Sequence, residues 1–186
     1  MAVYCDSDLQ FTNEVESGSI GVYRDGDISY QPGSVDLHLA DEYTLLEDTQ
    51  QPIDVTDEST YPETDKRTGV DAIPVKPQQF VLARTDEWIE LDGSVIGFLD
   101  GRSSVGRMGL FVENAGLVDP GFSGTLTLEL FNATQNTIVL QPDMRIVQLT
   151  VQELTDTAAV NYDAKRDEKY DEQLDVTPSR LHTDFD

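Results

Sequence analysis

Apolar and polar residues alternate in several short stretches of this chain, and the clearest stretch is Gly124–Asn132. There Leu126, Leu128 and Leu130 occupy every second position, which is the period of a β-strand. Because successive side chains of a strand point to opposite faces, Glu129 is predicted to lie opposite the leucines. From this spacing alone, a single carboxylate on that face is typical of a residue that points into solvent.

The same alternation predicts further strands before and after this one. Val35, Leu37 and Leu39 alternate with Asp36 and His38, which predicts a half-buried strand in which the histidine has a structural role. Other apolar runs that indicate strands lie at 73–75, 78–91, 94–99 and 136–154. Many short strands separated by turns predict a mainly β fold, a barrel or a sandwich, in a single domain spanning 1–186.

Three segments depart from this pattern. Residues 2–18 are predicted to contain a short amphipathic helix. Residues 48–70 are rich in Asp, Glu, Thr and Pro, which predicts an acidic loop without chemistry of its own. The C-terminal segment 161–186 is polar and carries tyrosines and basic residues, and its composition alone favours a solvated helix.

The charge balance is extreme, with 36 acidic residues against 12 basic ones and a formal net charge of −24. Such a chain repels nucleic acids and anionic membranes, so neither is expected as a partner. The acidic side chains also repel one another, and molar salt screens this repulsion within about 3 Å. We therefore expect a halophilic setting. No apolar run reaches the length of a membrane span and no signal pattern opens the chain, so a soluble cytoplasmic protein is expected.

Candidate chemistry begins in the segment GRSSVGR, Gly101–Arg107. Guanidinium groups pair with phosphate oxygens, and serine hydroxyls and loop amides bind the remaining oxygens. The segment is not a P-loop, because GxxxxGK[ST] occurs nowhere in the chain. Taken by itself, GRSSVGR is explained equally well by a surface turn. The motif DPGFSG at 119–124 and the strand with Glu129 follow it closely, however, and the combination is more specific than the segment alone.

Taken together, these motifs resemble the dCTP deaminase branch of the dUTPase-like superfamily. The shared features are GRSS followed after two residues by Arg, Asp-Pro-Gly-aromatic, a strand with Leu-Glu, and the later strand PDMRIVQL at 142–149. The resemblance extends back to GSVDLHL at 33–39 and omits roughly 49–70. It implies a distorted β-barrel of the β-clip type with few helices, assembled as a homotrimer with active sites between subunits. The interval between Arg107 and Asp119 is one residue shorter than the family pattern, beside the expected base pocket.

The resemblance implies hydrolytic deamination of dCTP to dUTP and ammonia. Glu129 is implied to be the general acid and base, Ser103 to hold the attacking water, and Arg107 to steady Glu129. Contacts to phosphates, deoxyribose and base are implied for Arg102, Ser104, Val105, Gly106, Asp119, Thr127 and Leu128. The segment 161–186 is implied to be a lid over the nucleotide, contributing Tyr162, Lys169 and Gln173.

Cofactor expectations follow from the same residues. With only Cys5, His38 and His182 as soft or imidazole ligands, neither a disulfide nor a zinc site of a zinc-dependent deaminase is expected. Mg²⁺ is expected with the triphosphate and its waters, not in a protein cage. The resemblance also makes dTTP a candidate feedback inhibitor. Together with the charge, it predicts an origin in a halophilic archaeon or its virus.

Two alternatives stay open beside release of dUTP. The segment AGLVD, 115–119, is similar to the corresponding segment of bifunctional members, in which Asp119 would activate a second water to release dUMP and pyrophosphate. A catalytically silent nucleotide-binding regulator would follow if the shortened interval had damaged the base pocket. A plain dUTPase is disfavoured, because its glycine-rich C-terminal arm is missing and Glu129 would be unnecessary.

Overall fold

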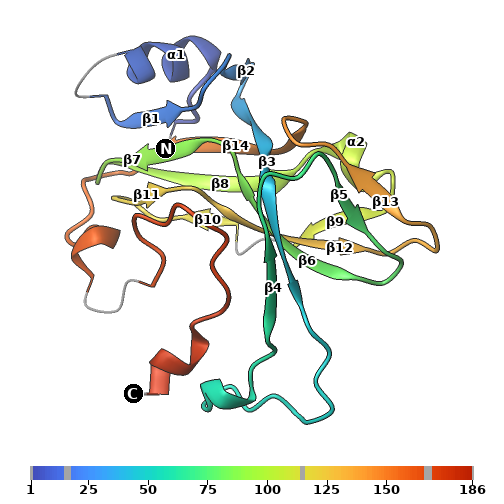
Figure 1. The fold of residues 1–186 in the computed structure, drawn as a ribbon. Helices are drawn as coiled ribbons and strands as arrows, with labels where there is room; N and C mark the ends of the chain where they lie inside the picture. The colour runs from blue at the N-terminus through green and yellow to red at the C-terminus, as the bar shows by residue number, and fades with distance from the viewer. Residues whose placement is uncertain (1, 15–17, 114–115, 166–168, 186) are drawn as a thin grey trace.

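The structure is a computed structural model, and it describes residues 2–14, 18–113, 116–165 and 169–185. Short strands make up most of the described chain, and the helices are few and short (Figure 1). Every pairing between named strands is antiparallel. The mainly β fold expected from the alternating pattern is therefore confirmed.

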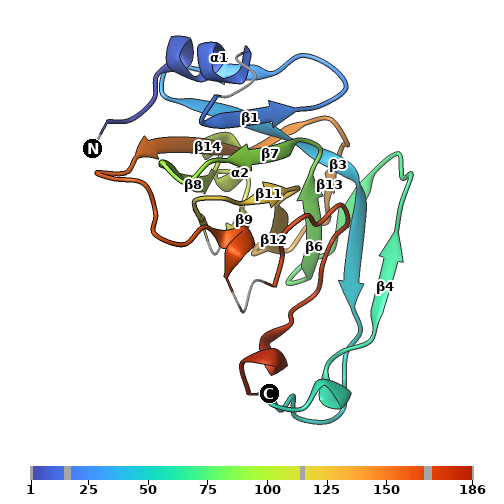
Figure 2. The same ribbon diagram turned by 90° about the vertical axis from the view of Figure 1, so that its left-hand side faces the viewer.

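The largest sheet has nine strands and curls into a half-barrel (Figures 1 and 2). Two of its strands, β2 (Ser29–Gln31) and β4 (Thr64–Arg67), pair only with the long strand β3. The others follow one another in space as β10 (Leu117–Val118), β8 (Val95–Gly101), β14 (Arg145–Glu153), β3 (Ser34–Leu46), β6 (Phe80–Thr85), β12 (Thr127–Asn132) and β9 (Leu110–Glu113).

Two smaller sheets and five helical turns complete the fold. The three-stranded sheet consists of β1 (Ile20–Tyr23), β7 (Trp88–Leu91) and β11 (Ser123–Gly124), and the two-stranded sheet of β5 (Ile73–Val75) and β13 (Ile138–Leu140). The α-helices are α1 (Asp6–Glu14) and α2 (Ser103–Gly106), and the 3₁₀ turns are η1 (Glu58–Thr60), η2 (Tyr162–Ala164) and η3 (Leu181–Phe185). The helix predicted within 2–18 is thus present as α1, although residues 15–17 lie outside the described residues.

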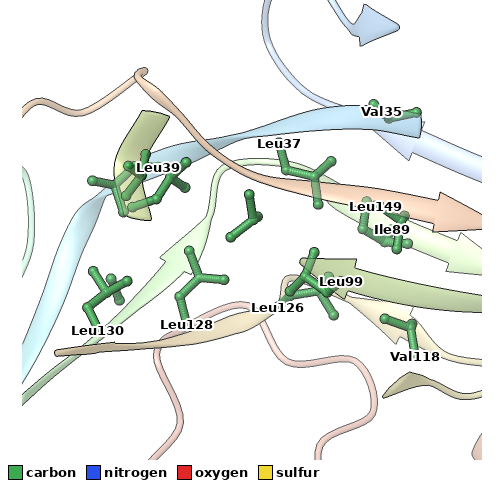
Figure 3. Packing of buried hydrophobic residues seen from close by; sticks show 14 of the residues in the cluster. Val35, Leu37, Leu39, Ile89, Leu99, Val118, Leu126, Leu128, Leu130 and Leu149 are labelled. Carbon is green, nitrogen blue, oxygen red and sulfur yellow. The ribbon is translucent and has the colours of Figure 1, made fainter. Parts of the chain in front are cut away.

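The core lies between these sheets, where one row of apolar side chains from each long strand meets the others (Figure 3). Leu37 and Leu39 of β3, Leu128 and Leu130 of β12, and Leu149 of β14 are each 0% exposed. Burial of such side chains stabilises a fold by about 1.5–3 kcal/mol each. The predicted alternation of β12 is confirmed, because its leucines are buried while Thr127, Glu129 and Phe131 are only half-buried.

Strand β3 differs from its prediction as a half-buried strand, because its first seven residues are buried on both faces. Asp36 and His38, expected on a polar face, are 2% and 8% exposed. The neighbours of β3 explain this: Glu87 lies 2.6 Å from His38 Nδ1 and accepts the His38 backbone N–H at 2.8 Å. The partnered and buried histidine agrees with the structural role predicted for it.

The segment 48–70 also differs from its prediction as a loop throughout. Its residues Thr64–Arg67 form β4, which pairs with Tyr43–Leu46 at the far end of β3. This hairpin, here called the arm (residues 43–67), projects from the sheet and carries η1 at its tip (Figure 2). The C-terminal turn η3 lies beside that tip in both views. Within the described residues, no helix is long and apolar enough to cross a membrane.

Candidate active site

A cavity of about 740 Å³ lies between β12, the turn that precedes β11, the arm and the C-terminal segment. Glu129 and Thr127 of β12 line it, together with Asp119, Tyr162 and Gln173. All five were proposed as site residues from the sequence, and the structure brings them to one cavity. Leu128, also proposed, faces the opposite way into the core, so only its backbone is available on the cavity side.

Glu129 reaches the cavity because of its strand register. It pairs with Leu82 of β6 on one side and with Glu113 of β9, the edge strand, on the other. Its half-buried side chain lines the cavity on the face opposite the buried leucines. The carboxylate therefore does not lie in the apolar core. It also does not lie on an open surface, which is the position that the spacing alone predicted.

Asp119 is held by a basic residue that was not assigned from the sequence. Lys165 Nζ lies 2.8 Å from Asp119 Oδ2, and the same ammonium group lies 5.1 Å from the centre of the Tyr162 ring. The Tyr162 ring in turn packs at 5.9 Å from that of Phe122. A lysine three residues after a tyrosine in a polar tail is too common a pattern to reveal this pairing.

The turn before β11 is shaped to receive the C-terminal segment. Tyr162 N–H donates to the Pro120 carbonyl at 2.8 Å. Gly121 has φ +83°, and a Cβ there would meet Asn161 Cβ at 2.5 Å. Only glycine adopts this backbone freely and leaves that space. The glycine of DPGF thus allows the segment carrying Tyr162 to approach the cavity.

The three residues proposed for the lid have different surroundings. The Tyr162 hydroxyl accepts the backbone N–H groups of Lys169 and Tyr170 at 3.4 and 3.2 Å. Lys169 itself pairs with Asp184 and does not line the cavity. Gln173 donates from Nε2 to the Thr125 carbonyl at 2.6 Å, and its buried Oε1 has no hydrogen-bond partner within the described residues. A phosphate contact by Gln173 would require this amide to turn.

The segment Arg102–Arg107 lies elsewhere in the chain, around the short helix α2. None of its residues lines the cavity with Glu129, and Val105 is buried in the core with 6% exposure. The expected side-chain cluster of Glu129, Ser103 and Arg107 is therefore not assembled within one chain. Figure 1 shows the reason, because α2 follows β8 and packs beside β9, on the far side of the molecule from β11 and the C-terminal segment.

Arg102 is oriented by a buried carboxylate. Asp36, 2% exposed, lies 3.2 Å from Arg102 Nε and 3.3 Å from Arg145 Nη1. Arg102 Nη1 also donates to the Arg145 carbonyl at 3.2 Å. A buried charge is stable only when it is paired in this way. Ser103, Ser104, Gly106 and Arg107 are exposed, so this loop can meet a ligand or a second chain.

The described residues contain no group of three or more His, Cys, Asp or Glu side chains placed to hold a metal ion. Of the carboxylates that line the cavity, Asp119 pairs with Lys165, and Glu58 lies 3.6 Å from His182 Nε2. Asp175, near the middle of the C-terminal segment, has its pKa lowered by a hydrogen bond from Lys66, and the pKa of Lys66 is raised chiefly by the same bond. Both partners are thus charged around neutral pH.

Comparison with solved structures supports the fold. A 2′-deoxycytidine 5′-triphosphate deaminase from Agrobacterium tumefaciens superposes with a TM-score of 0.60 and 19% identity. The match covers 80% of this chain and 46% of that protein, so this chain spans about half its length. EIAV dUTPase superposes with a TM-score of 0.50 and 15% identity over 75% of this chain and 92% of its own. At such identities the likeness concerns the fold alone.

Curated relatives are closer in sequence. A protein of Sulfurihydrogenibium sp. named "dCTP deaminase, dUMP-forming" is 38% identical over 181 residues, which is 97% of this chain and 98% of the relative. One of the same name from Aquifex aeolicus is 39% identical over 182 residues, 96% of this chain and 95% of the relative. A "dCTP deaminase" of Thermomicrobium roseum is 38% identical over 189 residues, 94% of this chain and 92% of the relative.

A family model described as dCTP deaminase-like matches residues 6–154, which include β12, the turn before β11 and the α2 loop. The match and the relatives agree with the motifs and with the half-barrel fold. This chain belongs to the dCTP deaminase-like family.

Proposed function

We propose that this protein converts dCTP and two waters to dUMP, ammonia and pyrophosphate. The observation that carries this proposal is a single cavity whose lining brings together Glu129 of β12 and Asp119 of the turn before β11, in a chain with several relatives that are named dUMP-forming. Two hydrolytic steps need two activated waters, and each carboxylate can serve one. The expectation of dUTP as the final product, favoured on sequence alone, gives way to this bifunctional alternative.

In the deamination step, Glu129 would take a proton from water as the water adds to C4 of cytosine. The same carboxyl group would then protonate N3 and the leaving amine, so that ammonia departs from a tetrahedral carbon. General acid–base catalysis of this kind contributes about 10²–10⁴-fold. The half-buried position of Glu129 supports this role, because exclusion of bulk water strengthens its interactions with the reacting groups.

In the second step, Asp119 would orient a water toward the α-phosphorus and accept its proton, and pyrophosphate would leave. Lys165 Nζ lies 2.8 Å from Asp119 Oδ2, so the ion pair fixes the direction of this carboxylate. Lys165 would have to shift toward the phosphates for Asp119 to reach a water. This lysine is therefore an addition to the residues proposed from the sequence.

The phosphates are assigned to the α2 loop of a second copy in a homotrimer. The exposed residues Ser103, Ser104 and Arg107 support this, because they lie outside the cavity of their own chain. Arg102, fixed by Asp36, would present its remaining N–H groups to phosphate oxygens, and Ser103 would hold the deamination water. The loop amides of Val105 and Gly106 are part of the same proposal, as are base contacts by the backbone of Thr127 and Leu128.

Mg²⁺ stays a prediction, as a partner of the nucleotide and its waters. When bound to triphosphate oxygens and water, it would neutralise part of the phosphate charge. This matters in a chain with a net charge of −24. Inhibition by dTTP, a cytoplasmic location and a halophilic source stay predictions.

Product analysis tests the function. The protein is incubated with dCTP and Mg²⁺ in 2 M KCl, and the nucleotides are separated by ion-exchange chromatography. We expect dUMP, pyrophosphate and ammonia in equal amounts. In Asp119→Asn, we expect dUTP to accumulate, because deamination keeps Glu129 while the second water loses its base. Accumulation of dUTP by the wild-type protein would show that it is a dCTP deaminase without the second activity. Binding of dCTP without turnover would show that it is a catalytically silent regulator.

A further inference from the structure

The C-terminal segment does not merely lie near the cavity, because Glu172 and Gln173 pair with β11 through backbone hydrogen bonds and an isolated β-bridge. Glu172 N–H donates to the Ser123 carbonyl at 2.7 Å, and Thr125 N–H donates to the Gln173 carbonyl at 2.9 Å. Gly124 and Gln173 form a parallel bridge. These bonds continue the pairing of β11 beyond the three-stranded sheet and align the segment along one wall of the cavity.

Gly124 makes this close docking feasible. A Cβ at this position would stand 3.2 Å from both the backbone N and the carbonyl O of Gln173. The residue also has φ +149°, which side-chain-bearing residues rarely adopt. The second glycine of DPGFSG is therefore required by the C-terminal segment, which lies nearly fifty residues further along the chain.

Docking ends at a buried carboxylate that the proposed chemistry does not use. Glu42, on β3, is 4% exposed and does not line the cavity. Its Oε1 accepts the Val176 backbone N–H at 2.7 Å and lies 3.2 Å from Lys66 Nζ. Its Oε2 lies 3.7 Å from Arg84 Nε. The Val176 side chain is itself 5% exposed, so this point of the segment is buried.

Three elements converge on Glu42. The pairing of β3 with β6 shifts register between Leu39 and Tyr43, and Glu42 lies within this irregular part of the strand. Lys66 of β4 joins it to the C-terminal segment, because Lys66 Nζ also pairs with Asp175 at 2.8 Å. A buried carboxylate is costly unless donors surround it. Here one of those donors is a backbone N–H of the C-terminal segment, so the charge is best satisfied when the segment is docked.

We propose that Glu42 is a positioning residue that fixes the C-terminal segment at Val176 and so holds Tyr162 and Gln173 at the cavity. The nucleotide-binding consequence rests on the proposed function, whereas the anchoring itself does not. Among the described residues beyond Val176 none is buried, and their contacts include His182 to Glu58 at 3.6 Å on the arm. Within the described residues, Val176 is thus the last buried position of the segment.

Hydrogen–deuterium exchange of the nucleotide-free protein tests the anchor. In Glu42→Gln we expect the amides of 172–177 to exchange at least about tenfold faster, because hydrogen bonds to charged groups are stronger than those to neutral ones. The amides of β12 and β14 should exchange as in the wild type. Asp65→Asn is the matched control, since Asp65 is a carboxylate of the arm that pairs with Arg67 and not with the C-terminal segment. It should leave 172–177 unchanged.

Kinetics test the consequence. Glu42→Gln should raise KM for dCTP about tenfold with kcat within about threefold, and Asp65→Asn should change neither by more than about twofold. Val176→Pro removes the same hydrogen bond from the other side, so the double variant should be no worse than the more affected single variant. Independent, multiplying effects would overturn the proposal, because Glu42 would then act through the sheet and not through the segment.

A wild-type protein that turns over no dCTP would refute the proposed function but not the anchor, because the exchange experiment does not depend on turnover. Unchanged exchange at 172–177 in a folded Glu42→Gln would overturn the anchor. If Glu42→Gln does not fold, Lys66→Met and Val176→Pro replace it in the same comparison, with the same expected acceleration. Wild-type exchange in both of these would equally overturn the anchor.

Discussion

At the scale of single residues, the position of Glu129 in its strand determines which face of the sheet its carboxylate occupies. Its neighbours Leu128 and Leu130 are fully buried, and the two-residue period then directs Glu129 to the cavity. What its sequence context could not show is that the polar face of β12 is covered. The arm and the C-terminal segment provide that cover, from residues that are more than thirty positions away in the sequence.

Glu129→Gln tests this assignment. The change keeps the shape of the side chain and removes its basicity, so we expect deamination to fall at least about 100-fold. Affinity for dCTP, measured by isothermal titration, should stay within about tenfold of the wild type. A variant that kept a tenth of the wild-type turnover would show that another group activates the water.

At the same scale, Lys165 was missed because its partner Asp119 is distant in sequence. Both residues lie in segments that were singled out, yet only the folded chain brings Nζ to 2.8 Å from the carboxylate. Arg102 illustrates the opposite case. Its place in a phosphate-binding pattern was evident from GRSSVGR, but its orientation depends on Asp36 of a strand read only as a half-buried element.

At the scale of elements, the two faces of β12 have different tasks. Leu128→Ala removes buried methyl groups and leaves a cavity, so we expect the free energy of unfolding to fall by about 2–5 kcal/mol. Glu129→Gln, the neighbouring change on the other face, should alter it by less than about 1 kcal/mol. Urea denaturation followed by circular dichroism measures both. Equal losses in the two variants would contradict the division of the strand into a core face and a cavity face.

Element boundaries were recovered where apolar periodicity was strong and lost where it was weak. Strands β3, β12 and β14 follow from their patterns, and α1 lies within its expected range. Strand β4 has no apolar periodicity, because Thr64–Arg67 is a polar edge strand whose formation depends on pairing with β3. It was predicted as part of a loop because its composition is polar and shows no strand period.

At the scale of the whole molecule, the net charge of −24 governs the response to salt. Like charges repel across a folded surface, and the Debye length falls from about 10 Å at 0.1 M salt to about 3 Å at 1 M. We therefore expect the Tm to rise steeply between 0.1 and 1 M KCl and to level off above that. Differential scanning calorimetry measures it. Sucrose at matched osmolality is the control, and an equal rise in sucrose would show that charge screening is not the cause.

The division of the candidate site is also a property of the whole molecule. The sequence places GRSSVGR and the strand of Glu129 within thirty residues, and the family resemblance implied that they meet at a site between subunits. Folding separates them, because β9 and the turn before β11 intervene and α2 lies away from the cavity. Joining them in a second copy of the chain is a proposal that the exposed Ser103 and Arg107 support.

The sequence by itself determined the family, the mainly β character, the core face of each periodic strand and the residue types available for chemistry. These are local properties, fixed by side-chain period and by short motifs. Tertiary structure alone decided that Glu129 faces a covered cavity, that Lys165 holds Asp119, and that Glu42 receives Val176. Each of these features joins residues more than thirty positions apart, and only packing of the sheets, the arm and the C-terminal segment brings such residues together.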